Sequence, residues 1–128
     1  MPSEIELLVG SPTPRVSTPR PYGPSRGVDL VDLAVALNEP LLPWQQHVAD
    51  AAHVVVDRGR WAHSTCGVLV SRQNGKSHLL RLRIIAGMLL WDERLILATA
   101  QSREVALETF RLVVETLESV PWLSRQVK

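Results

Sequence analysis

Cysteine and net charge are both scarce in this chain of 128 residues. Cys66 is the single cysteine, which excludes an internal disulfide framework and fits a reducing cytoplasm. The net charge is only +1, so no strong global field would draw the chain to nucleic acid or anionic lipid. Any contact with DNA must therefore be local.

Long hydrophobic runs and export signals are also missing. The longest uncharged apolar run, Ile84–Trp91, is far shorter than the roughly 20 residues that a membrane span needs. Glu4 and Glu6 replace the basic region of a signal peptide, and no long apolar core follows them. With 45% hydrophobic and 21% charged residues, the composition predicts one soluble intracellular domain.

Common catalytic and metal-binding patterns are absent as well. No Ser-His-Asp arrangement can be argued from the sequence. The histidines show neither metal-ligand spacing nor a partner cysteine pair. They are His47, His53, His63 and His78.

Proline separates an N-terminal arm from the rest of the chain. Residues 1–27 contain six of the nine prolines, with serine, threonine and glycine between them. Such a segment cannot hold a helix or a central strand and has little to bury, so we predict a disordered arm. Its arginines, Arg15, Arg20 and Arg26, could contact phosphate or a partner, although solvated side chains are the simpler expectation. Residues 28–128 form the predicted domain.

Hydrophobic spacing and turn residues predict four helices and two buried strands in that domain. The helices are expected over Asp29–Leu37, Pro43–Arg58, Lys76–Trp91 and Arg103–Val120. The strands are expected at Val68–Val70 and Leu95–Ala100. From residue 61 onward the order is strand, helix, strand, helix, which favours a mostly parallel sheet covered by helices.

The most informative stretch is Gly67–Ser77, where a short aliphatic run is followed by a polar turn, Lys-Ser and a helix. This layout is typical of a phosphate-binding loop, in which backbone N–H groups at a helix start hold anionic oxygens. Lys76 would add a charge at the β- and γ-phosphates, and the Ser77 hydroxyl would bind Mg²⁺. The general pattern has glycine where Val70 stands, so an ordinary strand–turn–helix connection remains the alternative.

Two further features bear on nucleotide chemistry. Gln45 lies near a helix start upstream of the loop, and its amide can pair with the N6 and N7 edge of adenine, although a solvated side chain is the alternative. Met88–Glu93 imitates the acidic strand of an ATPase. We reject that interpretation because a parallel neighbouring strand needs a crossover of a dozen or more residues after Lys76.

Three segments together resemble the large subunit of bacteriophage terminase, the ATPase motor that packages double-stranded DNA into procapsids. They are Ser71-Arg72-Gln73-Asn74-Gly75-Lys76-Ser77, Leu42-Pro43-Trp44-Gln45 and Leu97-Ala98-Thr99-Ala100-Gln101. The resemblance covers about residues 38–120. Terminases replace the usual first glycine of the loop and place an arginine inside it, which accounts for Val70 and Arg72.

The resemblance implies an α/β fold of the P-loop NTPase class, RecA-like (ASCE), with a partial parallel sheet and flanking helices. It also implies ATP and Mg²⁺ as cofactors, with Gln45 at adenine and Ser77 at the metal. Arg72 and Lys76 are then the catalytic residues, with Arg72 at the γ-phosphate, although a positioning contact or a structural ion pair is the alternative for Arg72. The implied nucleotide contacts in the loop are Ser71, Arg72, Gln73, Asn74, Gly75, Lys76, Ser77 and His78.

The implied partners are double-stranded DNA, portal protein, the small terminase subunit and further copies in a ring, inside an infected bacterial cell. Terminases continue with an acidic strand and a nuclease domain, and these 128 residues contain neither. We therefore expect nucleotide binding without efficient hydrolysis. The two strands would be separated by strands from a longer chain or a partner. The alternatives are a fragment of another P-loop motor, such as a helicase, and a non-catalytic module that binds portal or terminase subunits.

Overall fold

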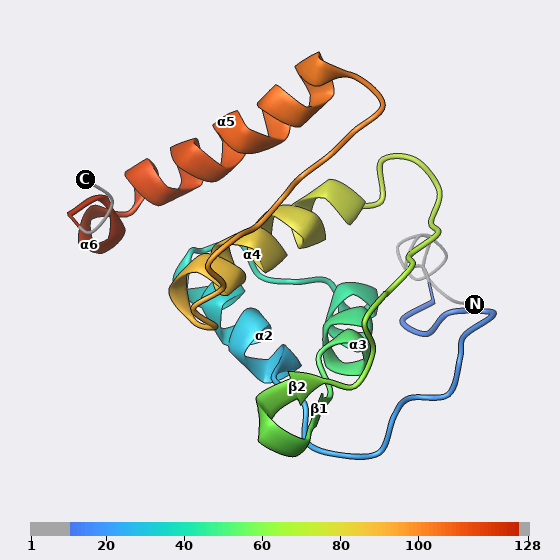
Figure 1. The fold of residues 1–128 in the computed structure, drawn as a ribbon. Helices are drawn as coiled ribbons and strands as arrows, with labels where there is room; N and C mark the ends of the chain where they lie inside the picture. The colour runs from blue at the N-terminus through green and yellow to red at the C-terminus, as the bar shows by residue number, and fades with distance from the viewer. Residues whose placement is uncertain (1–10, 126–128) are drawn as a thin grey trace, which may run out of the picture.

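Helices make up most of the regular structure in the computed structural model, which describes residues 11–125 (Figure 1). The helices are α2 (Gly27–Ala36), α3 (Pro43–Ala52), α4 (Lys76–Leu89), α5 (Arg103–Ser119) and α6 (Pro121–Ser124). Two short strands, β1 (Val55–Val56) and β2 (Arg60–Trp61), are joined by the 3₁₀ turn η1 (Asp57–Gly59). They pair antiparallel, with Val55 opposite Trp61.

All four expected helices are confirmed, but several of their ends differ from the predicted ones, and α4 ends at Leu89, two residues early. Helix α2 begins two residues early, at Gly27, whose N–H donates to Ser25 Oγ at 3.0 Å. Helix α3 ends at Ala52, six residues before the predicted end. The valines at 54–56 follow it, and β-branched residues favour extended backbone, so they enter a bridge with Ser25 and then β1.

The predicted strands are not formed within the described residues. Val68–Val70 and Leu95–Ala100 lie in long connecting segments before α4 and α5, without a ladder partner (Figure 1). The reason is physical: a strand needs a hydrogen-bonded neighbour, and aliphatic composition alone does not provide one. The P-loop NTPase class stays a prediction, because the parallel sheet that defines it is not built by residues 11–125.

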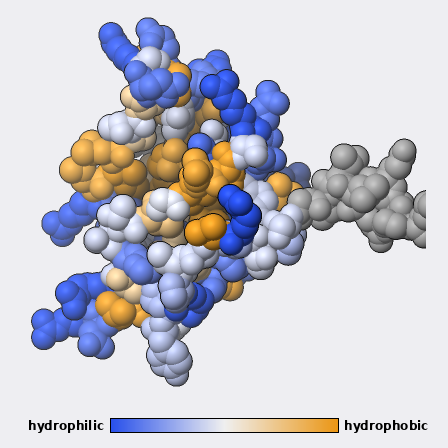
Figure 2. Space-filling model, turned by 90° about the vertical axis from the view of Figure 1, so that its right-hand side faces the viewer, coloured by the Kyte–Doolittle hydropathy of each residue, from blue (hydrophilic) through white to orange (hydrophobic). Residues whose placement is uncertain are grey.

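These two segments also leave large hydrophobic side chains in solvent. Leu69 is 99% exposed, and Leu95 and Leu97 are 76% and 79% exposed. Hydrophobic surface is likewise conspicuous on the face shown in Figure 2. Exposed apolar side chains that gather into a patch are typical of a protein–protein contact.

The hydrophobic core lies where α2, α3 and α4 pack together, and the C-terminal half of α5 closes one side of it. Helix α4 supplies its centre, with Leu82 and Ile85 fully buried. Helix α5 adds Val113 and Leu117, while Phe110 on its first half is 66% exposed. Among the described residues, no helix combines the length and apolarity of a membrane span.

An aromatic cluster joins the end of α3, β2 and the exit of α4. The ring centroids of Trp61 and Trp91 are 5.0 Å apart, and those of His53 and Trp91 are 4.9 Å apart. The Arg83 guanidinium lies 4.6 Å from the Trp91 centroid and makes a two-pronged ion pair with Glu93, at 2.7 and 2.9 Å. Glu93 is therefore held in a structural contact, and Met88 and Leu89, which would begin the acidic strand, belong to α4.

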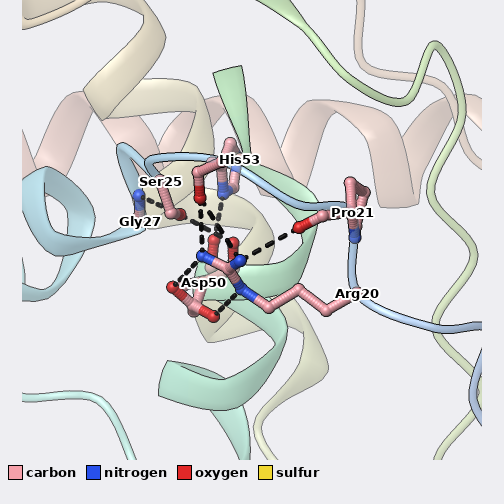
Figure 3. Close-up of polar contacts among 8 residues, drawn as sticks. Arg20, Pro21, Ser25, Gly27, Asp50 and His53 are labelled. Carbon is pink, nitrogen blue, oxygen red and sulfur yellow. Dashed lines mark hydrogen bonds and ion pairs between the residues drawn. The ribbon is translucent and has the colours of Figure 1, made fainter. Parts of the chain in front are cut away.

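The last part of the predicted arm is tied to α3 (Figure 3). Arg20, which we expected to be solvated, pairs with Asp50 at 2.6 Å, and Ser25 Oγ donates to the Asp50 carbonyl at 2.6 Å. The Arg26 N–H donates to the His53 carbonyl at 2.9 Å. The rest of the arm prediction includes residues 1–10, which lie outside the described residues.

Candidate functional site

The predicted phosphate loop forms a tight bend directly before α4. Gln73 and Gly75 have left-handed backbone conformations, with φ of 62° and 87°. The Asn74 side-chain amide donates to the Ser71 carbonyl at 3.3 Å across the bend. Residues 71–74 are exposed and Gly75 is half-buried, so the bend lies at the surface with its last residue against the core.

The start of α4 is open. Lys76 and Ser77 are its first residues, both exposed, and no side chain caps the helix. The first N–H of α4 with an acceptor is that of Leu79, which donates to the Gly75 carbonyl at 3.2 Å. Within residues 11–125, the N–H groups of residues 76–78, in the first turn of α4, have no acceptor. Free N–H groups at the positive end of a 14-residue helix make a favourable position for an anion.

A cavity of about 430 Å³ adjoins this helix start. It lies between α3, α4 and the segment that follows β2, and Lys76 and Ser77 line part of it. Trp61 and Arg83 contribute to its far wall. Its volume falls within the range of about 300–1,000 Å³ that small-molecule sites occupy. Lys76 and Ser77 therefore border a space large enough for a phosphorylated ligand, whereas Gln45, residues 71–75 and His78 do not line it.

A second cavity, of about 700 Å³, is separate from the predicted site residues. Residues 12–21, the Trp44 side of α3 and residues 65–70 surround it. Neither Gln45 nor any of residues 71–78 lines it.

Gln45 is brought to the loop but not to solvent. It is 1% exposed, its Oε1 accepts from the Leu42 N–H at 2.7 Å, and its Nε2 donates to the Gly75 carbonyl at 2.7 Å. Recognition of adenine by Gln45 stays a prediction, and it would require this buried amide to leave both partners.

His78 is directed away from the loop. Its Nδ1 accepts from Arg81, which has only donors, at 2.9 Å, so its Nε2 carries the proton and donates to the Glu39 carbonyl at 3.2 Å. Arg81 also pairs with the Glu39 carboxylate at 2.8 Å. The His78 ring thus joins α4 to the connection between α2 and α3. It would have to leave these contacts to reach a nucleotide.

Arg72 is exposed and, among residues 11–125, forms no hydrogen bond or ion pair. The alternative of a structural ion pair at Arg72 therefore has no partner in the described chain. An unengaged guanidinium beside an open helix start is suited to contact an anion. Whether it contacts the γ-phosphate stays a prediction.

Sequence reasoning missed how the loop is attached to the rest of the molecule. Gln45 is the third residue of α3, where a glutamine side chain commonly reaches back to the N–H before the helix, so its bond to Leu42 was readable. Its bond to Gly75 joins residues 30 positions apart, and no local pattern shows it. The contributions of Trp61 and Arg83 to the cavity were missed for the same reason.

No family model, curated protein or solved structure matches this chain. Function is therefore inferred from the geometry of residues 71–78 and from the motif resemblance alone.

Proposed function

We propose that this chain is the nucleotide-binding part of a P-loop ATPase of the terminase large-subunit type. In the complete motor, ATP hydrolysis drives double-stranded DNA into a procapsid. Residues 71–77 bind the triphosphate, and the first turn of α4 supplies N–H groups to its oxygens. ATP with Mg²⁺ is the cofactor.

One observation carries the proposal. Lys76 and Ser77 open a long helix that has no side-chain cap, after a bend with two left-handed residues, and both line a ligand-sized cavity. The starts of α2 and α6 also lack a side-chain cap, so the distinguishing feature of α4 is the combination of its open start with Lys76, Ser77 and the cavity. A start left open beside a lysine and a serine supports phosphate binding.

Each loop side chain has a role in this proposal. Lys76 contacts the β- and γ-phosphates, and Arg72 places a second positive charge at the γ-phosphate, so both are catalytic in the complete motor. Ser77 binds Mg²⁺ together with phosphate oxygens.

Little hydrolysis is expected from these 128 residues alone. A P-loop ATPase needs a carboxylate that orients the attacking water, and we assign no residue of this sequence to that role. The exposed segments at 68–70 and 95–100 would each pair with strands of a longer chain or a partner. The further partners of the complete motor are portal protein, the small terminase subunit and copies of itself in a ring.

The test is a titration of the chain with fluorescent mant-ATP and Mg²⁺, comparing wild type with Lys76→Ala. Loss of a charge-assisted contact to phosphate should weaken binding about tenfold to a hundredfold. Arg103→Ala is the matched control, because Arg103 also opens a helix with an exposed cation, and it should leave binding unchanged. No binding by wild type, or equal binding by wild type and Lys76→Ala, would overturn the proposal.

The exposure of Leu69 and Leu97 favours a second candidate, a non-catalytic module completed by a partner chain. Capture of the chain by purified portal protein or by a terminase subunit, at equal strength with and without ATP, would support it. A helicase-type motor is the third candidate, and it shares the nucleotide site. Retention by procapsids rather than by a forked DNA substrate separates the packaging motor from the helicase.

A further inference from the structure

The buried side chain of Gln45 connects the start of α3 to the start of α4, where the proposed function places the phosphates. Its Oε1 accepts from the Leu42 N–H before α3, and its Nε2 donates to the Gly75 carbonyl before α4. Both bonds measure 2.7 Å, and 1% of the residue is exposed. The amide retains one N–H and one lone pair, but this burial keeps them from a ligand.

Gly75 is shaped to receive this side chain. A Cβ added at Gly75 would lie 2.6 Å from Gln45 Nε2, closer than non-bonded atoms approach. The residue also has φ of +87°, a conformation that side chains disfavour. Glycine at position 75 therefore serves the approach of Gln45 as well as the turn of the backbone.

The bond to the Gly75 carbonyl fixes the direction of the next N–H group. All peptide bonds among the described residues are trans, so the Gly75 carbonyl and the Lys76 N–H point in opposite directions across one rigid plane. The carbonyl is held on the inner side by Gln45 and by the Leu79 N–H. The Lys76 N–H therefore points out of the helix start, toward the place where the proposal puts phosphate.

We propose that Gln45 is a positioning residue for phosphate: it holds the Gly75–Lys76 peptide so that the Lys76 N–H faces the ligand, and it does not read the base. This inference rests on the proposed phosphate-binding function and replaces the adenine contact predicted for Gln45. It makes the loop geometry depend on α3, because movement of the Leu42–Gln45 segment would move the carbonyl that Gln45 holds.

The deciding experiment compares two ligands that share phosphates but differ in the base. Binding of Mg-ATP and of Mg-tripolyphosphate is measured by calorimetry for wild type and Gln45→Glu. The glutamate keeps the acceptor for the Leu42 N–H. Burial favours the neutral carboxyl group, which could still donate to the Gly75 carbonyl, so binding is measured at pH 8.5 to favour the ionised form, which cannot donate. We expect both ligands to bind about fivefold to tenfold more weakly, by the same factor, because one hydrogen bond that aligns the loop is lost.

Gln46→Glu is the matched control. Gln46 is the exposed neighbour, its Nε2 donates to the Leu41 carbonyl at 3.0 Å, and it has no bond to Gly75. It carries the same change of charge one position away, and it should leave both affinities unchanged. Thermal unfolding of both variants checks that each remains folded.

A second measurement needs no variant. In nuclear magnetic resonance spectra of wild type, the Gln45 side-chain amide protons should stay protected when tripolyphosphate binds and when ATP binds, while the Lys76 amide signal shifts with both. A loss of affinity for ATP alone in Gln45→Glu, or release of the Gln45 amide only by ATP, would show that Gln45 reads adenine. Unchanged affinity for both ligands would leave it a structural residue. If wild type binds neither ligand, the proposed function itself fails.

Discussion

The starts of α4 and α5 follow similar sequence patterns but differ in how they are capped. Each helix follows an apolar segment and a polar turn, and each opens with an exposed cation, Lys76 or Arg103. Before α5, Ser102 has extended backbone and its Oγ accepts from the Val105 N–H at 3.4 Å. Before α4, Gly75 is left-handed and no side chain caps the helix. One helix start is closed by its own chain, and the other is left open.

The two helices also differ in how firmly they are held. Helix α4 crosses the core and buries five residues, and Gln45 fixes the peptide at its start. Helix α5 buries three residues, all in its second half, and its start lies in solvent. An anion site benefits from N–H groups that do not move when the ligand arrives. The contrast teaches that openness alone is not the distinguishing feature: the open start is also the one that a side chain from another helix holds in place.

The largest effect should come from breaking the left-handed turn with Gly75→Ala. Strain at φ of +87° and the clash with Gln45 should lower the free energy of unfolding by about 1–3 kcal/mol, measured by urea denaturation. Gly67→Ala is the control: nothing lies within 4 Å of its added Cβ, so the change should stay within about 0.5 kcal/mol. Equal stability of the two variants would show that the turn does not require glycine.

Replacing the serine at each helix start, Ser102 before α5 or Ser77 in α4, should have an intermediate effect. Ser102→Ala removes the cap of α5 and should lower the free energy of unfolding by about 1 kcal/mol, with nucleotide affinity unchanged. Ser77→Ala removes no hydrogen bond seen among residues 11–125, so stability should change by less than about 0.5 kcal/mol while Mg-ATP binds more weakly. Chelation of Mg²⁺ should then abolish the difference in affinity between Ser77→Ala and wild type, and a difference that persists would contradict the metal role.

The smallest effect should be a pH dependence of the free energy of unfolding, which we assign to His53 near α4. Burial lowers the pKa of His53 below its ordinary value of 6.5, and Arg83 adds to this, while the hydrogen bond to the Ala49 carbonyl and the charge of Glu93 oppose it. Between the lowered pKa and about 6.5, His53 is protonated in the unfolded chain but neutral in the folded chain. The free energy of unfolding should therefore fall as the pH drops through this range. Above that range this contribution is fully present.

Urea denaturation between pH 5 and pH 8 measures the slope. His63→Gln is the control, because His63 is exposed, and it should keep the wild-type slope. His53→Gln should lose part of it. A slope identical in all three chains would assign the pH dependence to other groups.

The helices were predictable because their signals are local. The apolar spacing of α4 and α5, Pro43 at the start of α3 and Ser102 at the start of α5 each act within one or two turns. The predicted end of α3 was wrong by six residues. We placed it before the glycine at position 59, but the valines at 54–56 prefer extended backbone and end the helix earlier.

The strands and the attachment of the loop were beyond a local pattern. Val68–Val70 and Leu95–Ala100 have strand composition, but pairing depends on a neighbour that the composition does not name. The position of the loop before α4 was predictable from Gly-Lys-Ser. The hydrogen bond from Gln45 to the Gly75 carbonyl was not predictable, because it depends on how α2 packs with α3 and α4.

The close pair of Trp61 and Trp91 gives the chain a built-in optical label. Their rings meet at 71° with centroids 5.0 Å apart, near enough for their ultraviolet transitions to interact. One ring belongs to β2 and the other follows the exit of α4, so their circular dichroism reports whether the hairpin and this helix are still joined. The junction that anchors the loop-bearing helix can therefore be followed spectroscopically without any added dye.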